Sequence, residues 1–300
     1  MIEELVEAIG QKNPRQRRPV EAALSTLHDE ERRDLTAWVR HAVSRGNSAT
    51  SLAAAYDLVV RDTLREQVYF RRHGRYRHAS FADVASDVYF SPAYMQQYME
   101  GLALTGFFWE NHVVLRRFLL HALARLPRVR RYLEVGPGHG LHLAAAARLG
   151  CAESFEAIDL SPTSVALCND LLTSGALGAL PAVHVREADF LGAEVDGPFG
   201  IVVMGEVLEH VERPDLFLVR ARELLSDGGH LLCTTCIDAP AIDHIRHFRS
   251  VEEVEALLFD AGLDVIERCV LPHPGLSLAE AAEQRLAVNV GFVARTRPRA

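Results

Sequence analysis

The stretch Tyr132-Leu133-Glu134-Val135-Gly136-Pro137-Gly138-His139-Gly140 decides the fold of this chain. It predicts a buried strand, then a glycine-rich turn, then a helix over Leu141–Leu149. Gly136, Gly138 and Gly140 let the backbone adopt positive φ and come close to a ligand, because no Cβ stands in the way. The first N–H groups of the helix then point toward that ligand. Such a turn fits either a dinucleotide or a nucleoside.

Acidic residues at the ends of four predicted strands indicate which kind of ligand the glycine turn binds. Glu134 lies in the end of the first strand, Asp159 follows the second, and Asp189 and Glu206 follow the next two. Asp159 stands where a nucleotide-type ligand presents its ribose hydroxyls. Glu134 would repel a pyrophosphate, and Pro137 removes one N–H donor of a phosphate cradle. The pattern disfavours NAD and favours a ligand with a positive centre and several hydroxyl or amine donors.

Residues 126–296 resemble a class I S-adenosylmethionine-dependent methyltransferase. Four segments carry the resemblance, in order and with ordinary spacing: 133–140, 157–161, 187–190 and 204–211. S-adenosylmethionine has a sulfonium, an α-amino group, a ribose diol and an adenine amine, which suit the four acids. The resemblance implies the fold and the cofactor, and it carries no information on the acceptor.

The resemblance also implies a role for each residue at the methionine end of the cofactor. Glu134 would act on the amino group, directly or through water. The three glycines of the turn would shape it under the methionine moiety. Glu206 and His210 would lie below the sulfonium and near the acceptor.

At the nucleoside end, the same resemblance assigns four further residues. Asp159 would bind both ribose hydroxyls, and Leu160 would flank the adenine. Asp189 would accept a hydrogen bond from the adenine amine. Phe190 would pack on the adenine ring.

Composition and charge narrow the classes of function. The chain has 300 residues and a formal net charge of −8, which argues against a nucleic-acid acceptor because phosphate binding requires a basic face. The arginine-rich segments 71–78 and 125–131 are interpreted as solvated helix ends and loops. No apolar run is long enough to span a bilayer, and residues 1–10 do not resemble a signal peptide. We therefore expect a cytoplasmic protein whose cysteines, Cys233 and Cys236 included, are buried small residues.

The pattern of elements divides the chain in two. Residues 1–126 predict an all-helical N-terminal domain, which we expect to bind the acceptor and to lie as a lid over the strand ends. In residues 127–300 strands and helices alternate, which predicts an α/β, Rossmann-like, seven-stranded and mostly parallel sheet with helices on both faces. The expected strands are 131–135, 154–158, 182–188, 199–204, 230–235, 263–271 and 286–294. The expected helices are 141–149, 162–174, 214–225 and 250–261, with 107–126 as the last helix of the N-terminal region.

Candidate catalytic residues follow the fourth and fifth strands. Methyl transfer from a sulfonium is an in-line displacement, so the protein must align the reactants, exclude water and, for some acceptors, supply a base. His244 is the first candidate for direct acceptor contact, and His210 is the second. Asp243 could orient a base or ligate a metal. For His247, beside Phe248 at a helix entry, a structural role and acceptor contact both stay open.

Three residues of the helical region are candidates for the acceptor site. Tyr98, Trp109 and His112 could belong to the helical core, or they could roof an apolar acceptor over the strand ends.

Alternatives remain at this point. Convergence of histidines with Asp243 would favour a metal-assisted C-methyltransferase of an α-keto acid or a similar enolisable acceptor. The sequence lacks a tight metal-binding spacing, so we expect no resident metal. An NAD-type oxidoreductase and a non-catalytic binding protein are the other two hypotheses. We expect a small-molecule acceptor and no nucleic-acid or membrane partner, and the extra helices are compatible with a homodimer.

Overall fold

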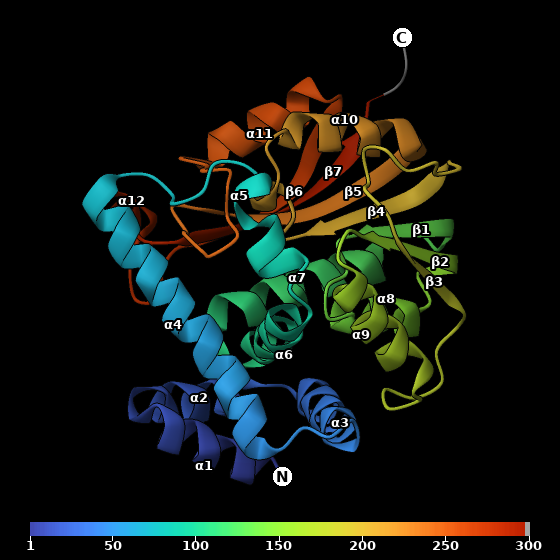
Figure 1. Cartoon of the computed structure of the whole chain (residues 1–300). Coiled ribbons are helices and arrows are strands. Elements are labelled where there is room, and N and C mark those ends of the chain that lie inside the picture. Colours follow the sequence, from blue (N-terminus) through green and yellow to red (C-terminus); the bar gives the residue numbers. More distant parts are fainter. Residues whose placement is uncertain (298–300) are drawn as a thin grey trace.

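The computed structural model describes residues 1–297, which are built on one seven-stranded sheet (Figure 1). The strands are β1 (Val129–Val135), β2 (Ala152–Asp159), β3 (Val183–Glu187), β4 (Phe199–Gly205), β5 (Leu225–Ile237), β6 (Leu263–Leu271) and β7 (Val288–Thr296). Their order in the sheet is β3-β2-β1-β4-β5-β7-β6. Strands β1 to β5 pair in parallel, and β7 runs antiparallel between β5 and β6. The expected Rossmann-like, mostly parallel sheet is confirmed.

The strand order places a crevice at the carboxyl ends of β1 and β4. From β1 the chain proceeds outward through β2 and β3, then returns to form β4 on the other side of β1. Successive connections therefore diverge above the β1–β4 pair, where open α/β sheets bind their ligands. The register pairs Val135 with Met204, so the turns that follow these two strands adjoin.

Helices cover both faces of this sheet. On one face lie α10 (Pro214–Leu224) and α11 (Val251–Asp260), and on the other lie α7 (Glu110–Arg125), α8 (Leu141–Leu149) and α9 (Pro162–Thr173). A short 3-10 turn, Leu208–His210, follows β4.

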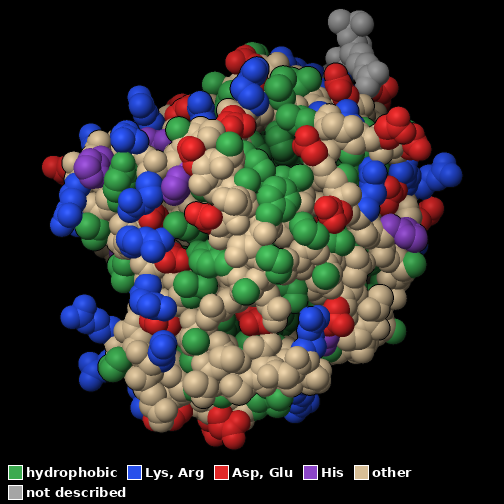
Figure 2. Space-filling model, in the orientation of Figure 1, with side chains coloured by type: hydrophobic (Ala, Val, Ile, Leu, Met, Phe, Trp, Pro, Cys, Tyr) green, Lys and Arg blue, Asp and Glu red, His purple; other side chains and the backbone are tan. Residues whose placement is uncertain are grey.

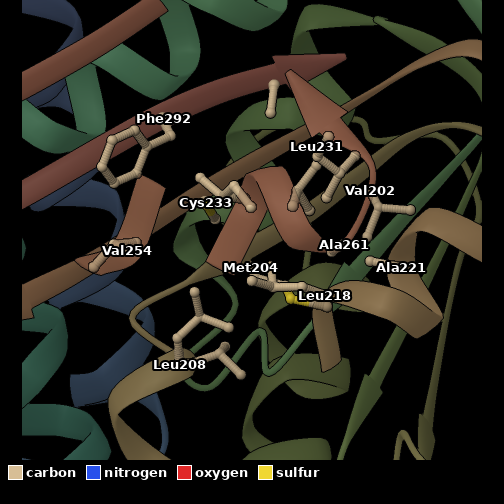
Figure 3. Close-up of a cluster of buried hydrophobic side chains, with 14 of the residues drawn as sticks. Val202, Met204, Leu208, Leu218, Ala221, Leu231, Cys233, Val254, Ala261 and Phe292 are labelled. Atoms are coloured by element: carbon tan, nitrogen blue, oxygen red, sulfur yellow. The ribbon is translucent and has the colours of Figure 1, made fainter. Parts of the chain in front are cut away.

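Alternation along the buried strands supplies each face with its own core. Met204 packs with Leu218 of α10 and Val254 of α11, among the side chains in Figure 3. Its neighbour Val203 points to the opposite face, where it joins Leu143 of α8. Successive strand residues point to opposite faces, so a strand buried on both sides has a continuous apolar sequence.

The N-terminal region is helical, as expected. Its helices are α1 (Ile2–Lys12), α2 (Pro14–Thr26), α3 (Asp29–Ser44), α4 (Ala49–His73), α5 (Ala82–Val84) and α6 (Pro92–Phe108), with a π-helical turn at Ala85–Tyr89. In Figure 1, α4 rises from the layer of α1–α3 along the edge of the molecule toward α12 (Leu278–Gln284). Apolar side chains of these helices share one buried cluster with Leu141 and Ala144 of α8 and Leu171 of α9. The helical region and the sheet region therefore meet through a common core, and a domain boundary at residue 126 stays a prediction.

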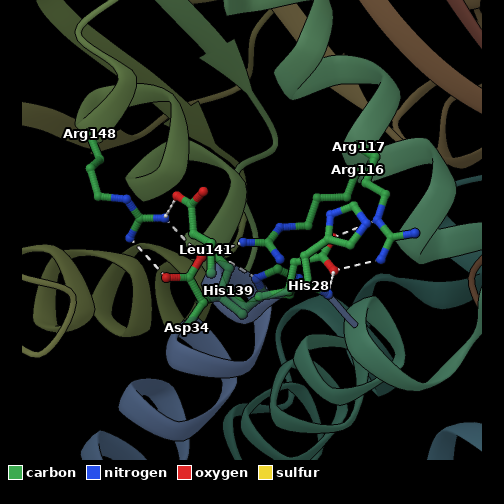
Figure 4. Close-up of polar contacts among 9 residues, drawn as sticks. His28, Asp34, Arg116, Arg117, His139, Leu141 and Arg148 are labelled. Atoms are coloured by element: carbon green, nitrogen blue, oxygen red, sulfur yellow. Dashed lines mark hydrogen bonds and ion pairs between the residues drawn. The ribbon is translucent and has the colours of Figure 1, made fainter. Parts of the chain in front are cut away.

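Buried ion pairs join α3 to the helices beside the sheet (Figure 4). Asp34 of α3 accepts hydrogen bonds from Arg116 of α7 at 2.7 Å and from Arg148 of α8 at 2.9 Å. Glu31 accepts two from Arg117 at 2.7 and 2.6 Å. Two guanidinium groups on one buried carboxylate fix how α3 sits against α7 and α8.

Several boundaries differ from expectation. The expected strand 230–235 is longer, because β5 covers Leu225–Ile237. The expected helix 107–126 is two helices, because the backbone is extended at Trp109 between α6 and α7. A helix that the sequence analysis missed, α12 (Leu278–Gln284), lies between β6 and β7. Ser277 and Glu280 form a capping box at its start, which is the local signal that could have found it.

None of the described helices is long and apolar enough to cross a membrane.

Close packing of α6 on α4 gives a test of this arrangement. A Cβ on Gly101 would lie 2.3 Å from the carbonyl oxygen of Ala55 and 2.6 Å from Val59 Cγ2. We expect Gly101→Ala to lower the free energy of unfolding by about 1–3 kcal/mol, because neighbouring backbone cannot move aside cheaply. Gly106→Ala, on the same helix with nothing within 4 Å, is the matched control and should be neutral or stabilising by up to about 1 kcal/mol. Equal midpoints in urea unfolding for both variants would contradict this packing.

Candidate functional site

One cavity of about 970 Å³ lies at the carboxyl edge of the sheet, between the strand ends and helices α4, α6 and α7. Fourteen of the sixteen residues singled out from the sequence line it: Glu134, Gly136, Gly138, Asp159, Leu160, Asp189, Phe190, Glu206, Tyr98, Trp109, His112, His210, Asp243 and His244. Among the described residues, Gly140 and His247 are the two of that set that do not. The tertiary structure thus brings cofactor candidates and acceptor candidates to one space, and their individual roles stay predictions.

The glycine turn forms a close-fitting floor. Gly136 and Gly138 have φ of +67° and +52°, the left-handed region in which only glycine is unstrained. A Cβ on Gly138 would lie 3.2 Å from Met99 Sδ of α6, so the turn and α6 enclose the cavity tightly. Gly140 serves another purpose, since its Cβ would lie 2.7 Å from Cys168 Sγ. That glycine lets α8 pack against α9 and does not contact the cavity.

Asp159 ends β2 at the cavity wall. Its Oδ2 accepts a hydrogen bond from the Gly138 N–H at 3.1 Å, and its Oδ1 accepts one from the Ser161 N–H at 2.9 Å. Burial raises the pKa of Asp159 to about 6, although these N–H groups act in the opposite direction. These hydrogen bonds hold the Asp159 carboxyl group in position beside the glycine turn.

Glu134 is 4% exposed at the end of β1. Its Oε2 accepts a hydrogen bond from the Tyr132 hydroxyl and lies 3.2 Å from His142 Nδ1. Within residues 1–297 no protein donor reaches Oε1, and Glu134 lines the cavity. One carboxylate oxygen is therefore anchored, and the other is available to a ligand.

Two buried carboxyl groups follow β4. Glu206 has φ of +52°, and its N–H donates to Thr234 Oγ1 at 3.0 Å. Its Oε1 is buried without a hydrogen-bond partner among the described residues. Glu209 accepts from the Thr235 hydroxyl at 2.8 Å, and burial with the adjacent Glu206 raises the pKa of Glu209 well above its usual range. A strained backbone and an unpaired buried oxygen at one position are typical of a binding site.

His210 and Asp243 lie together in the cavity wall. Its Nδ1 lies 3.1 Å from the main-chain oxygen of Asp243 and 3.4 Å from Asp243 Oδ2. The hydroxyls of Tyr98 and Tyr89 donate to the Asp243 carboxylate at 3.0 and 3.4 Å, and Tyr89 also lies 3.1 Å from His210 Nδ1. Burial and the Asp243 charge raise the pKa of both tyrosines well above 10, so they stay neutral donors. The oxygens around Nδ1 assign the imidazole proton to that atom and leave the Nε2 lone pair unused.

His244 stands beside His210, with ring centroids 4.7 Å apart at 87°. Its Nδ1 lies 2.6 Å from the main-chain oxygen of Ala239 and 3.7 Å from Cys236 Sγ. Burial and the nearby His210 lower the pKa of His244 to about 4. This imidazole is therefore neutral at physiological pH and presents an acceptor nitrogen.

The remaining acceptor candidates have local partners. Trp109 donates its indole N–H to Tyr56 at 3.1 Å, and its ring packs on His112 at 4.9 Å. Burial lowers the pKa of His112 to about 4. His247, outside the cavity, lies 2.6 Å from Asp238 Oδ1, an arrangement that favours the structural role for this histidine.

Unpartnered polar atoms test whether this cavity fits S-adenosylmethionine. Arg116 Nε, His142 Nε2 and Glu206 Oε1 are buried without partners among the described residues, and all three residues line the cavity. The cofactor carries an α-carboxylate for the cation and amine or sulfonium charge for the acids. The donor set therefore fits this cofactor.

Sequence reasoning missed four residues of the site: Tyr89, Arg116, Glu209 and Cys236. Glu209 had a signal, because it lies one turn beyond Glu206 and directly before His210. Arg116 and Tyr89 had none, because helices far away in the sequence bring them to the strand ends. Cys236, although buried as expected, also approaches Glu209 Oε1 at 3.8 Å.

Comparison with known proteins agrees with this geometry. The family model described as "Methyltransferase domain" matches residues 108–268. The ubiquinone biosynthesis O-methyltransferase of Xanthomonas axonopodis pv. citri is 37% identical over 167 residues, which cover 49% of this chain and 68% of the relative. Its counterpart in Xanthomonas euvesicatoria pv. vesicatoria is 37% identical over 154 residues, which cover 45% and 63%.

Solved structures share the fold at low identity. The (4+2)-cyclase SpnF has a TM-score of 0.50 and 17% identity, covering 63% of this chain and 82% of its own. The YcgJ protein of Bacillus subtilis has a TM-score of 0.50 and 12% identity, covering 63% and 100%. These likenesses show the fold alone. The family match, in contrast, covers more than half of the 300 residues and spans every cofactor motif, and the chain therefore belongs to the class I S-adenosylmethionine-dependent methyltransferases.

Proposed function

We propose that this methyltransferase acts on a hydroxyl oxygen of a small, largely apolar acceptor, with His210 as the general base. The placement of His210 supports this most directly. Its Nδ1 proton is held by Asp243, whose carboxylate lies 3.4 Å away and can stabilise the imidazolium that forms when Nε2 takes a proton. Two tyrosine hydroxyls hold that carboxylate in turn. The arrangement is a base with a fixed orienting group.

His244, the first candidate from the sequence, is less suited to this role. With a pKa of about 4 its imidazole has little affinity for the proton of a hydroxyl group at neutral pH. Its Nε2 is better suited to accepting a hydrogen bond from the acceptor, which would place the reacting oxygen beside His210. We therefore assign acceptor positioning to His244.

The lining beyond the strand ends supports an apolar acceptor. Met95, Met99 and Leu102 of α6 lie along it, together with Val59 of α4. A deprotonated oxygen in such surroundings is a strong nucleophile because water is excluded. The curated relatives in Xanthomonas carry O-methyltransferase names, which favours oxygen over carbon as the methylated atom.

Residues of this chain would hold the cofactor at both ends. Arg116 and His142 would bind the α-carboxylate, Glu134 Oε1 the amino group and Asp159 the ribose. S-adenosylmethionine supplies an electrophilic methyl group and departs as a neutral thioether, so no protein acid is needed for the leaving group. The protein's remaining tasks are alignment and removal of the acceptor proton.

Substitution of His210 tests the base. We expect His210→Gln to lower kcat by about 10²–10⁴-fold, because a glutamine amide cannot accept the proton. Release of S-adenosylhomocysteine from a panel of phenolic and catechol acceptors measures the rate. Binding of S-adenosylhomocysteine, followed by calorimetry, should change by less than about twofold because His210 lies on the acceptor side.

His244→Gln is the matched control for that experiment. It should raise KM more than it lowers kcat, because glutamine still offers a hydrogen-bonding oxygen. A collapse of kcat in His244→Gln with near-normal turnover in His210→Gln would reverse the two assignments.

Cofactor affinity should depend on pH through Asp159. Its pKa of about 6 in the free protein means that a proton must leave before the carboxylate can accept from the ribose hydroxyls. We expect S-adenosylhomocysteine affinity to be constant above about pH 7 and to fall toward about tenfold per pH unit well below pH 6. Calorimetry from pH 5 to 8 measures this.

Asp159→Asn should bind S-adenosylhomocysteine about 10–100-fold more weakly than the unmodified protein at pH 8, because the variant loses a charge-assisted hydrogen bond. The variant should also lack the pH-dependent step. A step of the same size in both proteins would show that another group is responsible.

Metal-assisted transfer to an enolisable acceptor is the second candidate function. His210, Asp243 and His244 offer ligand atoms within 4.8 Å of one another, and so do Glu209, Cys236 and His244. A divalent ion on the first set would occupy the base and would instead polarise the acceptor oxygen. The two mechanisms use the same side chains and exclude each other, because a histidine that ligates a metal cannot also act as the base.

Chelation separates the two candidates. Under the base mechanism, we expect dialysis against EDTA to leave turnover within about twofold of the untreated enzyme. Metal analysis of the purified protein accompanies the assay. Loss of turnover on chelation, with recovery on addition of Zn²⁺ or Mn²⁺, would favour the metal-assisted reaction.

A further inference from the structure

The end of the cavity beside α4 and the connection that contains α12 has its own charge. Leu64, Gln67, Val68 and Arg71 of α4 line it at i, i+3, i+4 and i+7, so all four lie on one face of the helix. Leu64 and Val68 are 59% and 49% exposed, which shows that the cavity opens to solvent here. The cavity therefore has an apolar mouth with a guanidinium at its rim.

A second segment, distant in sequence, forms the opposite side of this mouth. His273, Pro274, Leu286 and Ala287, from the connection that contains α12, also line the cavity. Gln67 Nε2 donates to the main-chain oxygen of Arg285 at 3.2 Å, so α4 and this connection touch. Arg285 Nη1 lies 3.4 Å from the position that a Cβ on Gly74 would take. The Arg285 side chain is thus folded onto the basic segment that follows Arg71.

Positive charge is concentrated in the segment that follows Gln67. From Gln67 to Ala82 the chain has arginines and histidines and no acidic residue. Arg77 pairs with Glu66, whereas Arg71, Arg72 and Arg285 form no ion pair within residues 1–297. Figure 2 shows the blue and purple side chains along the edge where α4 runs in Figure 1.

The contrast with the rest of the molecule is informative. The chain carries a net charge of −8, and the cofactor end of the same cavity is lined by Glu134, Asp159 and Glu206. Glu110 at the start of α7 is a further carboxylate of the lining. Arg71 at this opening has no ion pair within residues 1–297, and an unpaired guanidinium favours a bound anion.

We propose that this mouth, with Arg71 of α4 at its rim and Arg285 of the α12 connection beside the segment that follows Arg71, binds an anionic group at the distal end of the acceptor. The inference rests on the proposed function and refines its substrate class. The acceptor is an amphiphile with its hydroxyl at the His210 end, an apolar body along Leu64 and Val68, and a carboxylate or phosphate at the solvent end. The arginine-rich segment, interpreted from the sequence as a solvated loop, then selects the substrate.

A matched pair of probes tests the mouth without any methyl transfer. Decyl phosphate and decanol have the same apolar chain and differ in the anionic group. Binding of each to the protein saturated with S-adenosylhomocysteine is measured by calorimetry, below the concentration at which decyl phosphate forms micelles. We expect decyl phosphate to bind at least about tenfold more tightly than decanol, because one charge-assisted hydrogen bond contributes a difference of this size.

Arginine variants locate the preference. Arg71→Gln/Arg285→Gln should lose most of the preference for decyl phosphate and keep its decanol affinity, whereas Arg40→Gln, an exposed arginine on α3, should retain the preference. Equal binding of both probes to the unmodified protein would overturn the proposal, and so would an unchanged preference in the double variant. Because turnover is not measured, these outcomes are independent of whether His210 is the base.

Vesicles test the competing source of anionic groups. Vesicles of phosphatidylcholine with 30% phosphatidylglycerol, about the charge density of an anionic leaflet, are compared with phosphatidylcholine alone in a sedimentation assay. We expect no retention that depends on Arg71 and Arg285. Retention that requires both arginines, together with no preference for monomeric decyl phosphate, would replace the substrate subsite with a membrane-docking surface.

Discussion

Burial of several carboxyl groups in one cavity is the interaction on which the site depends. Asp159 is held by two backbone N–H groups and Glu206 has an unpaired oxygen, and neither has an ion pair among the described residues. Such groups resist ionisation, which is why burial raises the pKa of Asp159 to about 6 and raises that of Glu206. A ligand with a positive centre and several donors relieves this cost. The free protein is thus electrostatically prepared for a cationic methyl donor.

The acidic residues of this cavity fall into two groups that have different partners. Asp159, at the end of β2, is held by the N–H groups of Gly138 and Ser161. Glu134, at the end of β1, is anchored by Tyr132 and His142. In the proposed function, both acids bind the cofactor. Asp243 instead faces His210 and is positioned by Tyr89 and Tyr98, which come from the helical region. In the proposed function, the carboxylates that bind the cofactor therefore lie at the sheet edge, whereas the acceptor chemistry depends on tyrosines of the helical region. This division explains how one fold can serve many acceptors.

The helical region also gives the cavity its length. Helix α4 extends from the α1–α3 layer to the connection that holds α12, and its exposed face lines the cavity mouth. Gly101 lets α6 pack closely on α4, and the two arginines that pair with Asp34 hold α3 against α7 and α8. In the proposed function, an acceptor site lined by these packed helices would discriminate among acceptors by length and by the charge at the solvent end.

Local sequence determined the sheet and the cofactor edge of this protein. The glycine turn at 136–140 and the acids at 134, 159, 189 and 206 could be placed from the sequence because each directly follows its own strand, and the carboxyl ends of parallel strands share one edge. The start of α12 was encoded just as locally, in its capping box, although it was not recognised. What only the tertiary structure decided was the neighbourhood of each imidazole. Asp243 beside His210, His210 beside His244, and Arg285 against Gly74 are contacts between residues that are distant in the sequence. The basicity and charge of these side chains depend on burial and on partners that spacing along a chain does not specify.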